Sequence, residues 1–195
     1  MPKIIDDQEV YHAVIQTILE RGYAGATTRQ IAEAAGVSEV TLFRKYENKQ
    51  QLVKRAITAL VQQADFESAI RYTGDIHADL LRVLQAYQNS AISYAPFFAV
   101  LLSEISRDPE LSEAIAEPFR LFQSIGELIA RYQHEGALRT EDPFHAAAAL
   151  LGPLIYSAMM RGMLPNQVFS PFDLRTHVNL YLQGRGAQAE KQSPD

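Results

Sequence analysis

The chain contains no cysteine among its 195 residues, and this absence removes several kinds of chemistry. Disulfides, thiolate nucleophiles and cysteine-ligated zinc sites are all excluded. A cysteine-free chain suits a reducing compartment, and the first ten residues, MPKIIDDQEV, hold no apolar run of signal-peptide length. We therefore expect a cytoplasmic location.

Long hydrophobic runs and catalytic motifs are also missing. The longest uncharged run of the second half, residues 146–160, is too short to span a bilayer, so we expect a buried helix and no membrane partner. The histidines are scattered without metal-ligand spacing, and GRGA at 184–187 lacks the third glycine of a dinucleotide site. We predict no catalytic constellation, no cofactor and no metal, which excludes an enzyme.

The hydrophobic pattern indicates a chain that folds entirely into helices. Hydrophobic residues make up 47% of the sequence and charged residues 21%, ordinary values for a globular protein. Apolar residues recur every three or four positions, and the Asn-Gly and Asp-Gly pairs typical of hairpins do not occur. We predict an all-α fold.

A first helix is predicted over residues 7–21. Val10, Val14 and Ile18 form its apolar stripe, and Gly22 suits the left-handed backbone that follows a helix. The width of the stripe indicates a helix that packs into a core.

Capping residues mark the short helices that follow. Thr27 and Gln30 have the spacing of a capping box that starts a second helix. Ser38 is placed to cap a third helix, and Asn48 to cap a fourth. The second helix, a turn containing Gly36 and the third helix form a helix-turn-helix, whose second helix normally enters the DNA major groove.

One longer helix is predicted to continue after Asn48 through LVKRAITALVQQADFESAI and to link this unit to the rest of the chain. We place the domain boundary inside it, between a helix-turn-helix domain over residues 1–55 and a helical domain over residues 56–195. Further helices are predicted over residues 76–94, 96–106, 109–116, 117–134, 143–162 and 171–183.

The third helix has two chemically different sides. At about 100° per residue, Leu42, Phe43 and Tyr46 share one side, and we expect Phe43 to be a core residue rather than a DNA contact. A solvated surface helix would show the same division. The opposite arc carries Val40, Thr41, Arg44 and Lys45.

Charge is distributed unevenly along the sequence. Residues 27–55 hold six Lys or Arg against three acids, while residues 61–195 hold ten against 16. A polyanion meets the field of the surface that faces it, so the net charge of −5 does not exclude DNA as a partner. A basic element on an acidic body is expected.

The stretch TTRQIAEAAGVSEVTLFRKYENKQQL, residues 27–52, resembles the DNA-binding domain of the TetR family of bacterial transcriptional regulators. The resemblance covers roughly residues 10–59. It implies an N-terminal three-helix helix-turn-helix domain, joined by a linking helix to a C-terminal helical domain that binds a small-molecule effector and dimerises. Two recognition helices of the homodimer would then bind successive major grooves of a palindromic operator.

The resemblance also implies which residues touch double-stranded DNA. Base-edge contacts are expected from Glu39 to cytosine, Val40 to a thymine methyl and Arg44 to guanine. Thr41 is expected to face the groove floor beside them. Thr28 and Arg29 are expected near the phosphates, with Arg29 also within reach of a base edge, and the lysines are expected to bind phosphates. The full expected set is Thr28, Arg29, Glu39, Val40, Thr41, Arg44, Lys45 and Lys49.

Three residues depart from the family pattern. Phe43 replaces the usual tyrosine and lacks a hydroxyl for a phosphate, Val40 replaces a frequently smaller residue, and Tyr46 stands where phenylalanine is common. These departures leave the operator sequence open.

Large apolar residues of the second half are candidates for an effector pocket, which in the family lies among the middle helices. Ordinary core packing predicts the same stripe, and both interpretations stay open. A mostly apolar pocket would take a hydrophobic or aromatic effector. The candidates are Tyr87, Tyr94, Phe97, Phe98, Leu101, Phe119, Phe122, Tyr156, Met159 and Met160.

The last two helices are candidates for a dimer interface. The first of them is apolar nearly all round and rich in alanine, and the second offers a stripe of large apolar residues, so two helices from each subunit would form a four-helix bundle. The alternative is that they are buried within one subunit. The expected interface residues are Ala147, Leu151, Leu154, Ile155, Phe172, Leu174, Val178 and Tyr181.

Two functions follow from these patterns. The first is a ligand-responsive transcriptional regulator, a repressor that binds its operator as a homodimer. The second is an all-helical dimer that binds a ligand or a protein partner but not DNA.

Overall fold

The structure, a computed structural model, describes residues 6–63, 65–105, 107–109, 111–163 and 170–186. Every regular element within these ranges is a helix, and the predicted all-α fold is confirmed. The chain forms two compact units. The first consists of Met1–Gln63 and Tyr94–Pro118, and the second of Ala64–Ser93 and Phe119–Asp195.

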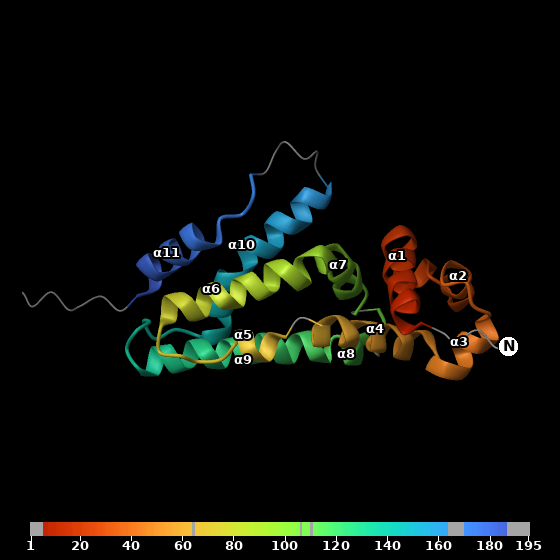
Figure 1. Cartoon of the computed structure of the whole chain (residues 1–195), viewed down its shortest axis with the longest axis horizontal. Helices are drawn as coiled ribbons and strands as arrows, with labels where there is room; N and C mark the ends of the chain where they lie inside the picture. Colours follow the sequence, from red (N-terminus) through yellow and green to blue (C-terminus); the bar gives the residue numbers. More distant parts are fainter. Residues whose placement is uncertain (1–5, 64, 106, 110, 164–169, 187–195) are drawn as a thin grey trace, which may run out of the picture. The chain divides into compact units, whose positions relative to one another are not determined.

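The first unit is built around α1. Its helices are α1 (Asp7–Gly25), α2 (Thr28–Ala34), α3 (Glu39–Tyr46), α4 (Lys49–Gln63), α7 (Ala95–Glu104) and α8 (Leu111–Ala114) (Figure 1). α1 packs against α2, α4 and α7, while α4 packs against α8. The core between them includes Ile18, Ile31, Leu42, Leu52 and Phe97, all buried. A segment from the middle of the sequence therefore completes the core of the N-terminal helices.

The predicted end of the first helix is confirmed. Gly22 has a φ of 70°, so the regular helix stops there before a short helical turn continues to Gly25.

The predicted caps are confirmed as well. The Thr27 hydroxyl accepts from the Gln30 backbone N–H at 3.3 Å, and the Gln30 side chain accepts from the Thr27 N–H at 3.0 Å. Ser38 caps α3 by accepting from the N–H of residue 41 at 3.1 Å. Asn48 accepts from the N–H of residue 51 at 2.8 Å, at the start of α4. Each cap satisfies a backbone donor that has no partner within its helix.

The prediction of one continuous helix after Asn48 is wrong. α4 ends at Gln63, and Asp65 has left-handed backbone angles (φ 41°, ψ 46°), which a right-handed helix does not accommodate. Aspartate tolerates this conformation better than most residues, and its carboxylate accepts from the Ser68 hydroxyl at 2.5 Å. The short helix α5 (Phe66–Ala69) starts after this break. α4 itself runs without interruption across residues 55 and 56.

The second unit packs four main helices around a separate core. It contains α5, α6 (Ile76–Ala86), the π-helical turn η1 (Tyr87–Ala91), most of α9 (Ala116–His134), α10 (Pro143–Met163) and α11 (Leu174–Arg185). α6 contacts both α5 and α11. Leu80, Leu84, Ile129, Leu151 and Val178 are buried in this core.

The helix predicted over residues 76–94 does not stay α-helical to its end. It widens at Tyr87 into η1 and then tightens into η2 (Ile92–Tyr94). The Ser90 hydroxyl donates to the Ala86 carbonyl at 2.8 Å, a bond that competes with the regular backbone ladder.

α10 is the longest apolar helix described. By length and composition alone, residues 143–161 could cross a membrane, although we expected the uncharged run within them, residues 146–160, to be too short. Ala146, Ala147, Leu150 and Leu154 are nonetheless buried in the core of the second unit. The helix packs as a core helix of that unit.

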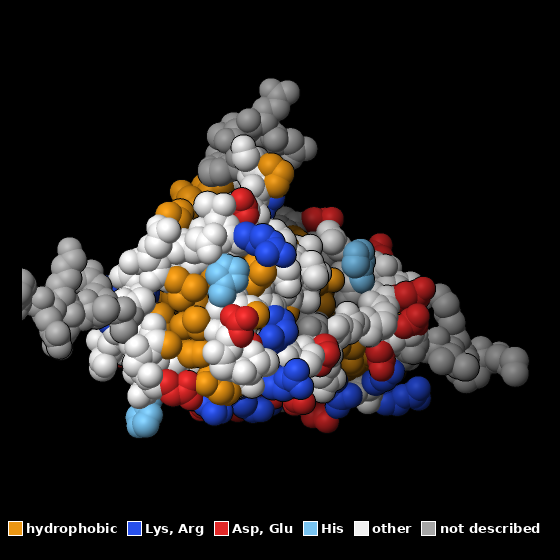
Figure 2. All heavy atoms as spheres, turned by 60° about the vertical axis from the view of Figure 1, so that its left-hand side comes forward, with side chains coloured by type: hydrophobic (Ala, Val, Ile, Leu, Met, Phe, Trp, Pro, Cys, Tyr) orange, Lys and Arg blue, Asp and Glu red, His pale blue; other side chains and the backbone are white. Residues whose placement is uncertain are grey.

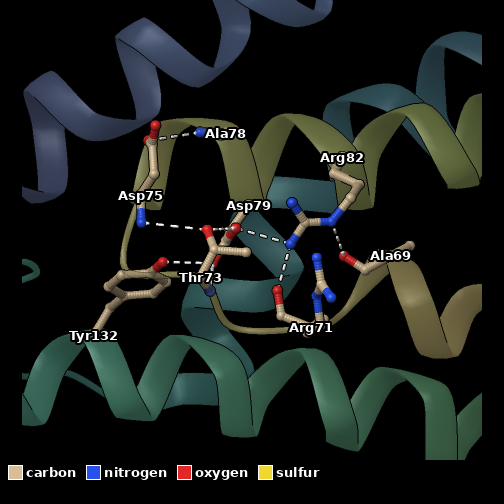
Figure 3. Close-up of polar contacts among 8 residues, drawn as sticks. All are labelled: Ala69, Arg71, Thr73, Asp75, Ala78, Asp79, Arg82 and Tyr132. Atoms are coloured by element: carbon tan, nitrogen blue, oxygen red, sulfur yellow. Dashed lines mark hydrogen bonds and ion pairs between the residues drawn. The ribbon is translucent and has the colours of Figure 1, made fainter.

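A buried carboxylate ties the start of the second unit together (Figure 3). Asp79 is fully buried and accepts from the Thr73 backbone N–H at 2.7 Å, the Tyr132 hydroxyl at 2.6 Å and the Arg82 guanidinium at 2.8 Å. Burial by itself would raise the pKa of Asp79, but these hydrogen bonds hold it below its ordinary value. Arg82 also donates to the carbonyls of Ala69 and Arg71. The chain between α5 and α6 is thus attached to both α6 and α9.

We expect Tyr132→Phe to lower the free energy of unfolding by about 1.5–3 kcal/mol at pH 7, because it removes a hydrogen bond to a buried charge. Urea unfolding measures the loss. Since the pKa of Asp79 is lower in the folded state, the contribution is present at neutral pH and disappears as pH falls through that value. Tyr72→Phe is the control, because its hydroxyl donates instead to Glu135 at the surface. Equal losses for both variants would contradict the assignment.

Candidate nucleic-acid interface

A tight turn places α3 against α2. Gly36 has a φ of 65°, a conformation that favours glycine, and the Val37 N–H donates back to the Ala32 carbonyl at 3.0 Å. Ala32 and Ala35 are buried, and their small side chains let the turn lie close to the core. The predicted helix-turn-helix is present in the first unit.

The outward face of α3 includes Val40 and Arg44 as predicted but is rotated toward Phe43. Leu42 and Tyr46 are buried, but Phe43 is 60% exposed, so its expected place in the core is wrong. The reason is rotational: the buried arc runs from Lys45 through Leu42 to Tyr46, and Phe43 lies beyond its edge. The outward arc consists of Glu39, Val40, Phe43 and Arg44.

Lys45 points toward α1 rather than away from the unit. Its Nζ forms an ion pair with Asp7, and the Tyr46 hydroxyl donates to the same carboxylate oxygen. The ring of Tyr46 packs edge-on against Tyr11 at a centroid distance of 6.2 Å, and Arg55 lies 5.6 Å from its centroid. This group joins the C-terminal end of α3 to the first turn of α1.

The shared carboxylate is held ionised. Partial burial would raise the pKa of Asp7, but hydrogen bonds from Lys45 and Tyr46, with the charge of Lys45, keep it below its ordinary value. Burial and the bond to Asp7 raise the pKa of Tyr46, so its hydroxyl remains a donor. Asp7 is not among the predicted site residues, because its position 38 residues before Lys45 gives no local signal.

The other end of α3 is attached to α2. The Thr28 hydroxyl donates to Glu39 Oε1 at 2.7 Å, although both side chains lie near the surface. The bond orients the first carboxylate of α3 and joins the two helix starts. Thr28 therefore lies beside the outward face of α3.

The remaining cations of the expected set differ in accessibility. Arg29 and Arg44 are exposed. Lys49 is partly buried: its Nζ donates to the Tyr23 carbonyl at 2.8 Å and lies 4.0 Å from the centroid of the Tyr23 ring. Burial lowers the pKa of Lys49. Arg29 and Arg44 are accordingly the cations most open to a polyanion.

The candidate pocket residues are divided between the two units. Tyr94, Phe97, Phe98 and Leu101 belong to the core of the first unit, where Phe97 and Leu101 have no exposed surface. The other candidates lie in the second unit. They are Tyr87, Phe119, Phe122, Tyr156, Met159 and Met160.

Most of these rings have partners of their own. Tyr87 lies 5.4 Å from Phe66, and Phe122 lies 6.1 Å from Phe144, measured between ring centroids. Phe119 and Tyr156 are 57% and 60% exposed. A hollow of about 800 Å³ in the first unit is lined by Tyr94 but by no other candidate. Phe97, Leu101, Tyr87 and Phe122 therefore pack in or against the two cores, whereas Phe119 and Tyr156 lie at the surface.

Most of the expected dimer-interface residues are buried within a single chain. Ala147, Leu151, Leu154 and Val178 have at most 1% of their surface exposed, and a side chain without exposed surface does not contact another copy. Leu174 and Tyr181 are also buried, while Ile155 and Phe172 pack partly against the same core. For these residues the alternative interpretation, burial within one subunit, describes the structure.

Other apolar side chains of the last two helices reach the surface. Tyr156 of α10 is 60% exposed and Leu180 of α11 is 61% exposed. Figure 2 shows hydrophobic side chains at the surface between charged ones, on the side that comes forward from the left of Figure 1.

Among the described residues, no group of three or more acids, histidines or cysteines is placed to hold a metal.

Two family models match the chain in consecutive segments. The model described as bacterial regulatory proteins, tetR family, matches residues 11–56, which include the whole helix-turn-helix. The model described as the C-terminal domain of AefR-like transcriptional repressors matches residues 78–179. Together they cover both parts of the predicted organisation.

Individual relatives agree with the family models. An uncharacterized HTH-type transcriptional regulator, YvkB of Bacillus subtilis, is 36% identical over 40% of each chain. The DNA-binding transcriptional repressor TetR of Mycobacteroides abscessus is 28% identical over 52% of this chain and 53% of its own. The matches span only about half the length, or less, of these curated relatives.

Solved structures share the fold. The fatty acid degradation regulator FadR from Bacillus halodurans superposes with a TM-score of 0.66 at 19% identity, over 94% of this chain and 95% of its own. An identity this low supports the fold and not a shared ligand.

We expect Asp7→Ala to destabilise the protein at pH 7 by about 1 kcal/mol, because the ion pair and the tyrosine hydrogen bond are lost together. Thermal unfolding followed by circular dichroism measures the change. The folded pKa of Asp7 is lowered, so its contribution is present at neutral pH and is lost as pH falls through that value. Glu9→Ala removes an exposed carboxylate from the same helical turn and is the control. A larger effect of Glu9→Ala would contradict the proposed anchor.

Proposed function

Because the chain belongs to the tetR family of bacterial transcriptional regulators and carries that family's DNA-binding domain, we propose that it is a ligand-responsive repressor in the cytoplasm. It binds a palindromic operator as a homodimer and releases it when a small hydrophobic or aromatic effector binds. The observation that carries the proposal is the outward arc of α3, which presents Glu39, Val40 and Arg44 while the opposite face is anchored to α1.

The outward arc has the chemistry for reading base edges. Arg44 pairs with the O6 and N7 acceptors of guanine, Glu39 accepts from the cytosine amino group, and Val40 packs on a thymine methyl. The hydrogen bond from Thr28 orients Glu39. Because a carboxylate only accepts hydrogen bonds, Glu39 pairs with a base that donates.

Phosphate binding falls mainly to the exposed arginine of α2. Arg29 is free to reach the backbone, and Thr28 and Thr41 lie at the helix starts where phosphates are received. Lys45 and Lys49 already donate to Asp7 and to the Tyr23 carbonyl, so they contribute through their remaining N–H groups. Their share of the electrostatic attraction is smaller than a free lysine would give.

Two copies are required because one helix reads only a few base pairs. In a dimer the two α3 helices meet half-sites about 34 Å apart, one turn of B-form DNA. The exposed apolar side chains of α10 and α11, Tyr156 and Leu180, supply a surface for the second copy. The expected four-helix contact is then made by the outer faces of these helices, not by the buried residues between them.

Release of the operator requires an effector that binds more tightly to the conformation of the dimer in which the two α3 helices cannot reach successive major grooves. The aromatic residues Tyr87, Phe119 and Phe122 of the second unit favour an apolar or aromatic ligand. The family model over residues 78–179 is named for repressors, which fits this proposal.

Arg44→Ala should weaken binding to a selected operator by about 1–3 kcal/mol and relax discrimination at one base pair, because a bidentate contact is lost. Fluorescence anisotropy with operator and scrambled duplexes, repeated across a salt series, measures both effects. The wild-type affinity should fall steeply with salt as counterions are released. Arg71→Ala removes the same charge from an exposed residue of the second unit and is the control. If Arg44→Ala lost equal affinity for operator and scrambled DNA, Arg44 would not contact a base.

Leu180→Glu should convert the dimer to a monomer, because it places a charge on the apolar surface assigned to the second copy. Light scattering coupled to size-exclusion chromatography gives the mass. Leu102→Glu makes the same change at a residue of the first unit with 58% exposure, against 61% for Leu180, and should leave the dimer intact. A dimer that persists in Leu180→Glu, with normal helical content, would place the interface elsewhere.

A further inference from the structure

The outward face of α3 contains an aromatic ring that the fold does not need. Phe43 is 60% exposed, and the buried side of the helix is filled by Leu42 and Tyr46, each 1% exposed. Val40, 78% exposed, lies three residues before Phe43 and therefore on the same side of the helix. Two large apolar side chains thus form a ridge on the short helix that faces outward.

Polar groups border this ridge on both sides. Glu39, held by Thr28, lies at one edge and Arg44 at the other, so apolar surface occupies the middle of the arc. A carboxylate and a guanidinium bind hydrogen-bonding base edges, whereas a phenyl ring has no donor and no acceptor. Phe43 also lacks the hydroxyl that would reach a phosphate. Its only attractive interaction with a duplex is apolar contact.

The major groove offers one apolar group, the C5 methyl of thymine. The Cβ atoms of residues three apart on a helix are separated by about 5–6 Å. Bases of one strand rise by about 3.4 Å, so two side chains at that separation reach positions one or two base steps apart. Val40 and Phe43 are therefore spaced to contact two different bases.

We propose that Phe43 is a specificity-determining residue whose ring packs on the methyl group of a thymine in each half-site, next to the base contacted by Val40. The inference rests on the proposed DNA-binding function and adds a recognition element to it. Each half-site then contains a thymine whose identity is read by its methyl group alone.

The test separates the methyl group from every other feature of the base. Duplexes bound by the wild-type dimer are selected from a random pool, and each thymine is then replaced by deoxyuridine, which lacks only that methyl. Removing one buried methyl should weaken wild-type binding about fourfold at a contacted position. Phe43→Ala should bind the thymine and deoxyuridine duplexes equally well at its own position and keep the wild-type penalty at the position of Val40.

Two further variants serve as controls. Phe43→Leu retains an apolar side chain and should keep part of the preference for thymine over deoxyuridine. If the effect of Phe43→Ala came only from disturbed folding, Phe43→Leu would show no such preference. Arg44→Ala should weaken every duplex but leave the ratio between thymine and deoxyuridine unchanged at the Phe43 position. Circular dichroism verifies that each variant retains the helical content of the wild type.

The outcomes distinguish this inference from the function on which it rests. If the wild type selects no sequence from the pool, DNA recognition itself fails. If it selects sequences but no deoxyuridine substitution depends on residue 43, only the thymine assignment is overturned. A loss in Phe43→Ala that is equal for all sequences would make the ring a contact to sugar or to a protein partner, and would also overturn the assignment.

Discussion

The rotation of α3 about its own axis depends on a small set of contacts at its inner face. Leu42 and Tyr46 are buried in the core, and the Tyr46 hydroxyl and Lys45 ammonium both donate to Asp7 in the first turn of α1. A helix of eight residues makes few contacts, so losing one of these would let it turn. The outward side chains owe their position to this anchoring.

The same contacts redistribute the positive charge of the helix-turn-helix. Asp7 neutralises the charge of Lys45 locally. Lys49 donates a hydrogen bond to the backbone of α1 and lies over the ring of Tyr23. Arg29 and Arg44 remain exposed. In the proposed homodimer the two helix-turn-helix units would bind DNA together, because linked sites raise the effective concentration of the second.

In the second unit, hydrogen bonds attach the irregular segment between α5 and α6 to the neighbouring helices. Asp79 accepts hydrogen bonds from the segment before α6 and from α9, and Arg82 caps two carbonyls of that segment. An ionised group without exposed surface is stable only when it is paired and hydrogen-bonded in this manner. The chain that follows α5 is thereby given a defined path into the unit.

Local features of the sequence determined the first helices, their caps and the family, since Thr27, Ser38, Asn48 and Gly22 act within a few residues of themselves. They did not reveal the break at Asp65 or the π-helical turn after Ala86. Local sequence also indicated the helix-turn-helix and its basic character. Periodicity did not determine which arc of α3 faces outward, because both 3.6-residue faces carry large side chains and contacts with Asp7 decide between them. Burial of the α10 residues within one chain likewise depends on packing against α6, α9 and α11, which the sequence of α10 does not reveal. Tertiary packing alone placed Phe43 at the surface and Lys45 in an ion pair, because the partners that decide their position are not their neighbours in the chain.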